Sequence, residues 1–118
     1  MGISVDNVQS ATALLKALSH RARLEIAGLL RHGEVCVCHL EAHLGYRQPY
    51  ISQQIMVLKK ARLVAERREG TYVYYRLADA RVAALLEALA PQASVPKARA
   101  RRVHACSCPE CAAPKARR

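Results

Sequence analysis

Residues 46–77, YRQPYISQQIMVLKKARLVAERREGTYVYYRL, change their hydrophobic period partway along the stretch. The first half carries apolar residues at helical spacing, and Pro49 suits the first turn of such a helix. The members of this inner stripe are Ile51, Ile55 and Leu58. From residue 63 onward the side chains alternate with period 2, and the pair Glu69-Gly70 lies between the two alternating runs. The stretch therefore predicts a helix followed by a β-hairpin that turns at Glu69-Gly70.

Helical patterns flank this stretch on both sides. We expect a helix over about residues 5–18, a second from an N-cap at Ser19 to Gly33, a third ending at Gly45, and a last one from Asp79 to near Pro91. Two short helices joined by a glycine-containing turn and followed by a hairpin describe a winged helix-turn-helix. The expected fold class is thus mainly α with a small β-hairpin.

The length of 118 residues suits one domain and a tail. We expect a domain over residues 1–90 and a flexible, basic, Pro- and Cys-containing tail over residues 91–118, where four of the five prolines lie. We find no signal peptide at the start and no apolar run of the roughly 20 residues that a membrane span needs. The sequence predicts a soluble, cytoplasmic protein with reduced thiols and no membrane partner.

The net charge of +10 is unevenly distributed. Residues 47–76 hold seven basic and two acidic side chains, whereas residues 1–46 hold four of each. Like charges gathered in a folded region are costly unless a polyanion faces them, and this pattern favours nucleic acid as the partner. The basic tail is equally consistent with a solvated surface.

Four motifs occur in order: LKALSHRARLEIAGLL, CVCHL, LGYRQPYISQQIMVLKKARLV and RREGTYVYYRL. Together they resemble the ArsR/SmtB family of metal-responsive bacterial repressors over roughly residues 10–90. The resemblance implies a homodimer that pairs through its first and last helices. It also implies binding to double-stranded operator DNA with an inverted repeat, and release of that DNA when metal binds.

The second helix of a helix-turn-helix enters the major groove, where Gln pairs with adenine and Arg with guanine. The candidate contacts from this helix are Arg47, Gln48, Tyr50, Ser52, Gln53 and Gln54. Arg67 and Arg68, near the hairpin tip, are candidates for phosphate or minor-groove contacts. The alternative is an exposed polar surface without a partner. Relatives usually carry Ser at the position of Arg47, so this chain lacks the expected cap of the helix.

Cys36 and Cys38 form an isolated pair of thiols ahead of the third helix. Positions i and i+2 of a helix point about 200° apart, so both thiolates can grip one ion only if the first helical turn is unwound or extended. Metal binding would thus disturb the element that precedes the DNA-reading helix. In family members with ELCVCDL at this place, the two cysteines are the ligands.

The third cysteine of arsenic-sensing relatives is replaced here by Glu41, and the N-terminal arm has no cysteine. The missing sulfurs lie in the tail, as Cys106, Cys108 and Cys111. A chain from residue 91 to 106 spans up to about 50 Å, so the tail is long enough to reach the pair. We expect a mixed thiolate site for As(III)/Sb(III) or Cd(II)/Pb(II), with Zn(II) less favoured. Alternatively, the tail cysteines bind an ion of their own, or His39 and His104 add nitrogen ligands.

Nothing in the sequence indicates an enzyme, since it holds no HExxH motif, no phosphate-binding glycine loop and no nucleophile with an evident base. The rival interpretations are a thiol redox or persulfide-sensing repressor of the same fold, a constitutive DNA-binding protein, and a metal buffer.

Overall fold

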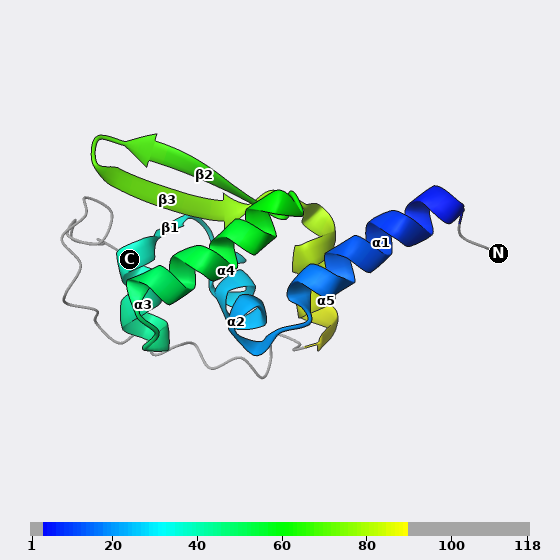
Figure 1. Cartoon of the computed structure of the whole chain (residues 1–118), viewed down its shortest axis with the longest axis horizontal. Helices are drawn as coiled ribbons and strands as arrows, with labels where there is room; N and C mark the ends of the chain where they lie inside the picture. Colours follow the sequence, from blue (N-terminus) through cyan, green and yellow to red (C-terminus); the bar gives the residue numbers. More distant parts are fainter. Residues whose placement is uncertain (1–3, 90–118) are drawn as a thin grey trace.

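The computed structural model describes residues 4–89 as five helices and three short strands (Figure 1). In chain order these are α1 (Val5–Leu18), α2 (Arg21–Leu30), β1 (Val35–Cys36), α3 (Val37–Leu44), α4 (Gln48–Lys60), β2 (Val64–Glu69), β3 (Tyr72–Leu77) and α5 (Ala80–Leu89). The predicted tail over residues 91–118, with its three cysteines, lies outside the described residues.

The helix-turn-helix consists of α3 and α4, joined by residues 45–47. Gly45 adopts the left-handed conformation with φ of 80°, and its N–H donates to the carbonyl oxygen of Glu41 at 2.9 Å, which ends α3. Pro49 lies in the first turn of α4, as the sequence predicts. The strands β2 and β3 form the wing beside α4 (Figure 1). The winged helix-turn-helix is therefore confirmed.

The start of α2 differs from the expectation. The N-cap is His20 rather than Ser19, and the Nδ1 atom of His20 accepts a hydrogen bond from the backbone N–H of Ala22 at 3.2 Å. Ser19 instead closes α1, since its N–H donates to the carbonyl oxygen of Lys16 at 3.2 Å. The turn between α1 and α2 contains two residues, so the C-cap of α1 and the N-cap of α2 are different residues.

The sheet has three antiparallel strands in the order β1-β3-β2, whereas the sequence predicts only a hairpin. The third strand, β1, has two residues, too few to show an alternating pattern. The hairpin loop also lies one residue later than predicted, because Glu69 still pairs with Tyr72 and the loop residues are Gly70 and Thr71. Gly70 has φ of 68°, a conformation that glycine adopts without strain.

The core is aliphatic, as expected of a chain without Phe or Trp. Its most deeply buried members come from all five helices and the turn before β2; they include Leu18, Ile26, Leu40, Ile51, Ile55, Leu58, Leu63 and Val82. Asp79 caps the last helix by accepting the backbone N–H of Arg81 at 2.9 Å, as predicted. Together these contacts fix the positions of α3, α4 and the wing.

The N-terminal part of α1 extends away from the body of the molecule (Figure 1). Leu14, Ala17 and Leu18 pack into the core, whereas the apolar side chains of Val8 and Leu15 are 43% and 52% exposed. The helix therefore has two apolar faces, and only one is covered within the chain. No helix within residues 4–89 has the length and apolar character required to cross a membrane.

Candidate nucleic-acid interface and thiol site

The outer face of α4 carries most of the residues predicted to contact bases. Those that are exposed are Arg47, Gln48, Tyr50, Ser52 and Gln53. The opposite face is buried, with exposed fractions of at most 1% for Ile51, Ile55 and Leu58. Because these three side chains fix the rotation of the helix in the core, the polar face is held outward.

Gln54, also predicted to contact bases, lies on the inner side of α4 with 8% of its surface exposed. Its Oε1 accepts a hydrogen bond from Nη1 of Arg23 at 2.8 Å, and Nε of the same arginine donates to the carbonyl oxygen of Ala17 at 2.5 Å. The arginine thus joins α1, α2 and α4. Gln54 therefore makes a contact within the protein, and it is not among the exposed candidate DNA contacts.

The chain that enters α4 is held by an aromatic residue. The hydroxyl of Tyr46 donates to Oε1 of Glu25 on α2 at 2.7 Å, and this bond raises the pKa of Tyr46. The rings of Tyr46 and Tyr50 lie 5.1 Å apart between centroids. Arg47, the N-cap, makes no side-chain capping bond, as expected from the missing Ser. Tyr46 therefore supports the start of α4 where its cap does not.

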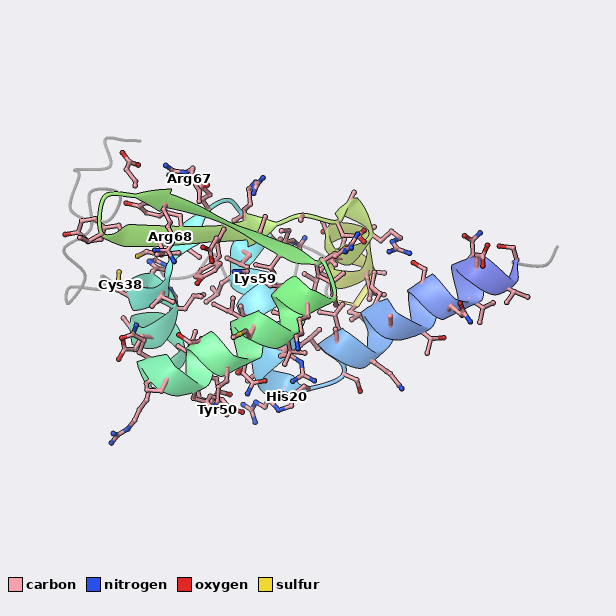
Figure 2. All side chains as sticks on the ribbon, turned by 45° about the horizontal axis from the view of Figure 1, so that its top comes forward. His20, Cys38, Tyr50, Lys59, Arg67 and Arg68 are labelled. Atoms are coloured by element: carbon pink, nitrogen blue, oxygen red, sulfur yellow. The ribbon has the colours of Figure 1, made fainter. Side chains whose placement is uncertain are left out.

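The two wing arginines, labelled in Figure 2, have different surroundings. Arg67 donates from Nη2 to Oε1 of Glu34 at 2.8 Å, from Nε to Oε2 of Glu34 at 2.9 Å and from Nη1 to Glu69 at 2.8 Å. Its guanidinium also lies 4.6 Å from the centroid of the Tyr74 ring. The Arg67 hydrogen bonds are the main cause of the lowered pKa of Glu34. This guanidinium is thus engaged on several sides within the chain.

Arg68 is the more exposed of the two, at 68% against 42% for the side chain of Arg67. Within residues 4–89 its ion pair is to Glu66, with 3.3 Å between Nε and Oε2. Glu66 also accepts from Lys59 of α4 at 2.7 Å, and that hydrogen bond is the main cause of the lowered pKa of Glu66. The Lys59–Glu66 ion pair joins the wing to the end of α4, and Arg68 lies on the surface (Figure 2).

The two thiols straddle a junction between strand and helix. Cys36 is extended, with φ of −90° and ψ of 164°, and it is both the last residue of β1 and the N-cap of α3, whereas Cys38 is in the first turn of α3 (Figure 2). Cys36 is 2% exposed and forms a small cluster with the fully buried Tyr74, against which Cys38 also packs. The backbone at Cys36 is therefore already extended, as the sequence argument requires for convergence of the pair.

Cys38 is disulfide-bonded in this structure. Within residues 4–89 no group of three or more His, Cys, Asp or Glu side chains has an arrangement that could hold a metal ion. A soft ion bound at the pair would therefore need a further ligand from the rest of the chain or from a second copy. Cys106, Cys108 and Cys111 lie outside the described residues.

Sequence reasoning missed the residues that support this site: Arg23, Glu34, Tyr46 and Tyr74. Each of them makes a contact with a residue 21 or more positions away, for example Arg23 with Gln54 and Tyr46 with Glu25. Such contacts leave no periodic signal in a single sequence.

The family profile described as "Bacterial regulatory protein, arsR family" matches residues 20–66. The "Biofilm growth-associated repressor" of Agrobacterium fabrum is 51% identical over 76 residues, which cover 64% of this chain and 65% of that protein. The "Arsenical resistance operon repressor" of Staphylococcus aureus is 39% identical, with coverage of 56% and 64%. The matched region thus spans slightly less than two thirds of either relative.

Solved structures match over more of their length. "Reduced HlyU" from Vibrio cholerae has a TM-score of 0.69 and 34% identity, covering 71% of this chain and 88% of that one. The homodimeric winged helix-turn-helix DNA-binding domain of Mb0332 from Mycobacterium bovis, titled a possible ArsR-family transcriptional regulator, has a TM-score of 0.65 and 34% identity, with coverage of 75% and 84%. With the profile match and the fold described above, these similarities show that the chain belongs to the arsR family of bacterial regulatory proteins.

Proposed function

We propose that this chain is a transcriptional repressor that reads duplex operator DNA with α4 and releases it when an effector binds its cysteines. The observation that carries the proposal is the polar outer face of α4, held outward by a buried inner face. Gln48 and Gln53 are suited to adenine, and Tyr50 and Ser52 are also exposed. Residues 1–90 form the DNA-binding and dimerisation domain in this proposal.

Phosphate contacts come from the basic side chains that border the helix. Arg47 precedes α4 without a capping bond, and Arg68 is the exposed wing arginine. Each phosphate contact releases counterions, so operator affinity falls as salt rises, by a log–log slope of about −0.9 per contact. This dependence is a direct measure of how many such contacts form.

The proposed homodimer pairs through α1 and α5. Val5, Val8 and Leu15 of α1 and Leu89 of α5 are large apolar side chains with 43% or more of their surface exposed. Helix faces of this kind are commonly covered by a partner. The similarity to the homodimeric Mycobacterium domain supports a second copy of this chain as that partner. Two-fold pairing presents two copies of α4, which suits an inverted repeat in DNA.

The proposed effector is a thiophilic ion, As(III)/Sb(III) or Cd(II)/Pb(II), held by the thiolates of Cys36 and Cys38. Because Cys36 is buried at the end of β1, where it caps α3, an ion that joins both sulfurs must displace Cys36 from its cluster with Tyr74. The connection from α3 to α4 is only residues 45–47, so the change reaches the DNA-reading helix. Cys106, Cys108 and Cys111 are the proposed source of the remaining ligands.

A second candidate is a thiol redox or persulfide switch of the same fold. The disulfide-bonded state of Cys38 favours it, as does the similarity to a HlyU structure titled as reduced. In such a step two thiols lose two electrons and two protons to an oxidant, such as a peroxide or a polysulfide, and one S–S bond forms.

A binding experiment separates the candidates. The operator is first selected from a random duplex library, and the binding of the full, reduced chain is then followed by fluorescence anisotropy. Arsenite, Cd²⁺, hydrogen peroxide and inorganic polysulfide are titrated separately against wild type, Cys36→Ser, Cys38→Ser and a chain with all three tail cysteines replaced by Ser. We expect arsenite or Cd²⁺ to release DNA from wild type and not from Cys36→Ser or Cys38→Ser.

Release by peroxide or polysulfide alone would favour the second candidate. Release that is equal in all four proteins would exclude a thiol effector site. Failure to select any DNA sequence would remove the repressor proposal itself.

A further inference from the structure

The register of the sheet aligns three side chains in one row. Cys36 of β1 lies opposite Tyr74 of the central strand β3, and Arg67 of β2 lies opposite the same tyrosine. Directly opposite residues of antiparallel strands have their side chains on the same face. The row Cys36–Tyr74–Arg67 thus runs from a thiol at one edge of the sheet to the wing at the other.

Contacts join the members of this row. Tyr74 is fully buried and packs with Cys36 in a cluster that stands apart from the main core. On its other side, the guanidinium of Arg67 lies over the ring, 4.6 Å from its centroid, at a range where a cation is attracted to a π face. The same guanidinium holds both oxygens of Glu34, two residues before Cys36. Together with the chain from Glu34 to Cys36, these interactions form a closed ring of contacts through Cys36, Tyr74, Arg67 and Glu34.

We propose that Arg67 is a positioning residue that passes a change at Cys36 to the wing, and that Arg68 makes the wing's contact with phosphate. The inference rests on the proposed function and adds a route through the sheet to the route along the chain into α4. Cys36 is 2% exposed against a ring that is fully buried, so the two cannot both keep their places when an ion bonds to this sulfur. Displacement of either residue removes support from Arg67 and frees the wing to turn.

The surroundings of the two arginines support this division of roles. A DNA phosphate would have to replace two carboxylates and an aromatic face around Arg67. Arg68 would lose one carboxylate contact at 3.3 Å. Contact with a DNA phosphate thus breaks fewer interactions at Arg68 than at Arg67. The contacts of the row hold Arg67 in one orientation.

The test compares Glu34→Gln with Glu66→Gln, since each removes one carboxylate that pairs with a wing arginine and only Glu34 belongs to the ring of contacts. The measured quantity is the ratio of operator Kd with and without saturating Cd²⁺ or arsenite. We expect Glu34→Gln to leave the effector-free Kd within about twofold and to reduce this ratio about tenfold. Glu66→Gln should leave the ratio unchanged. An unchanged ratio in Glu34→Gln would overturn the proposal.

Salt dependence tests the division of roles between the arginines. Arg68→Gln should reduce the magnitude of the log Kd against log salt slope by about 1, the effect of one lost phosphate contact, whereas Arg67→Gln should keep the wild-type slope. If Arg67→Gln lowers the slope as Arg68→Gln does, Arg67 is a DNA contact and the proposal is wrong.

A third measurement does not depend on DNA release. Alkylation of Cys36 by iodoacetamide, followed by mass spectrometry on the reduced chain, reports opening of the row. Glu34→Gln should speed it about fivefold or more relative to wild type and to Glu66→Gln. If wild type releases no DNA with any effector, the proposed function fails, and this rate alone then decides whether the row connects Cys36 to the wing. An unchanged rate would show that it does not.

Discussion

Arg23 and Gln54 are joined by a hydrogen bond of 2.8 Å between Nη1 and Oε1, although they are 31 positions apart in the chain. The same arginine donates to the carbonyl oxygen of Ala17, near the end of α1. Helix α4 is therefore connected through one side chain to α1, the helix proposed to form the dimer.

Replacement of Arg23 by Ala should lower the free energy of unfolding by about 1–3 kcal/mol, because it leaves the mostly buried amide of Gln54 without this partner. Urea denaturation measures the change. The control is Arg21→Ala on the same helix, whose side chain is 85% exposed and forms a surface ion pair with Glu25, so a change below about 0.5 kcal/mol is expected. Equal losses in the two variants would contradict the role given to Arg23.

Arg62 ends α4 in a conformation that suits glycine. Its φ is 61°, its N–H donates to the carbonyl oxygen of Lys59 at 2.8 Å, and the N–H of Leu63 donates to that of Leu58 at 2.9 Å, the pattern of a Schellman motif. Arg62→Gly should raise the free energy of unfolding by about 0.5–1 kcal/mol, because it relieves the strain of a left-handed residue with a Cβ. Thermal denaturation checks this, and a fall in the melting temperature would refute it.

Acid should weaken the wing. The pKa of Glu34 is lowered by its hydrogen bonds from Arg67, and the pKa of Glu66 by that from Lys59. A carboxylate with a lowered pKa in the folded state adds stability above its ordinary value of 4.5, and this stability is lost as the pH falls through the lowered pKa. We expect the free energy of unfolding to decrease from about pH 5 to about pH 3, and to decrease less in Glu34→Gln.

Urea titrations across this range measure the effect, and Glu41→Gln, which changes an exposed carboxylate of α3, is the control. If Glu34→Gln and Glu41→Gln have the same pH profile, the ion pair with Arg67 contributes nothing to the acid response.

Leu15→Glu should weaken dimerisation. A two-fold interface contains each leucine twice, and loss of two buried leucines corresponds to a rise in the dimer dissociation constant of about a hundredfold or more. Sedimentation equilibrium measures this constant. Met56→Glu, at a similarly exposed apolar residue of α4, should leave it unchanged. A dimer that withstands Leu15→Glu would place the interface elsewhere.

Much of the fold was predictable because strong local signals mark its elements. Gly45 and Asp79 act at the helix ends where the sequence places them, and the buried stripe of α4 has the predicted members. The cap of α2 was predicted one residue early because Ser is the better general capping residue, whereas the geometry here selects His20. The strand β1 was missed because its existence depends on pairing with β3, a contact between distant residues.

The candidate site was predictable in its residue types and less so in their orientation. Gln53 and Gln54 are neighbours of the same type, yet one is exposed and the other is bonded to Arg23, since successive helical residues point about 100° apart. Likewise Arg67 and Arg68 are adjacent in one strand and point to opposite faces. The partners that distinguish the members of each pair, Arg23 of α2 and Glu34 before β1, are distant from them in the sequence.

The projecting end of α1 has a consequence for gene dosage. One face of this helix is left without cover inside a single chain, so its ordering by a second copy is a bimolecular event that obeys mass action. Under the proposed pairing, occupancy of an operator would rise more steeply than linearly with the number of chains in the cell. A modest change in expression would then change the degree of repression sharply, even in the absence of an effector ion.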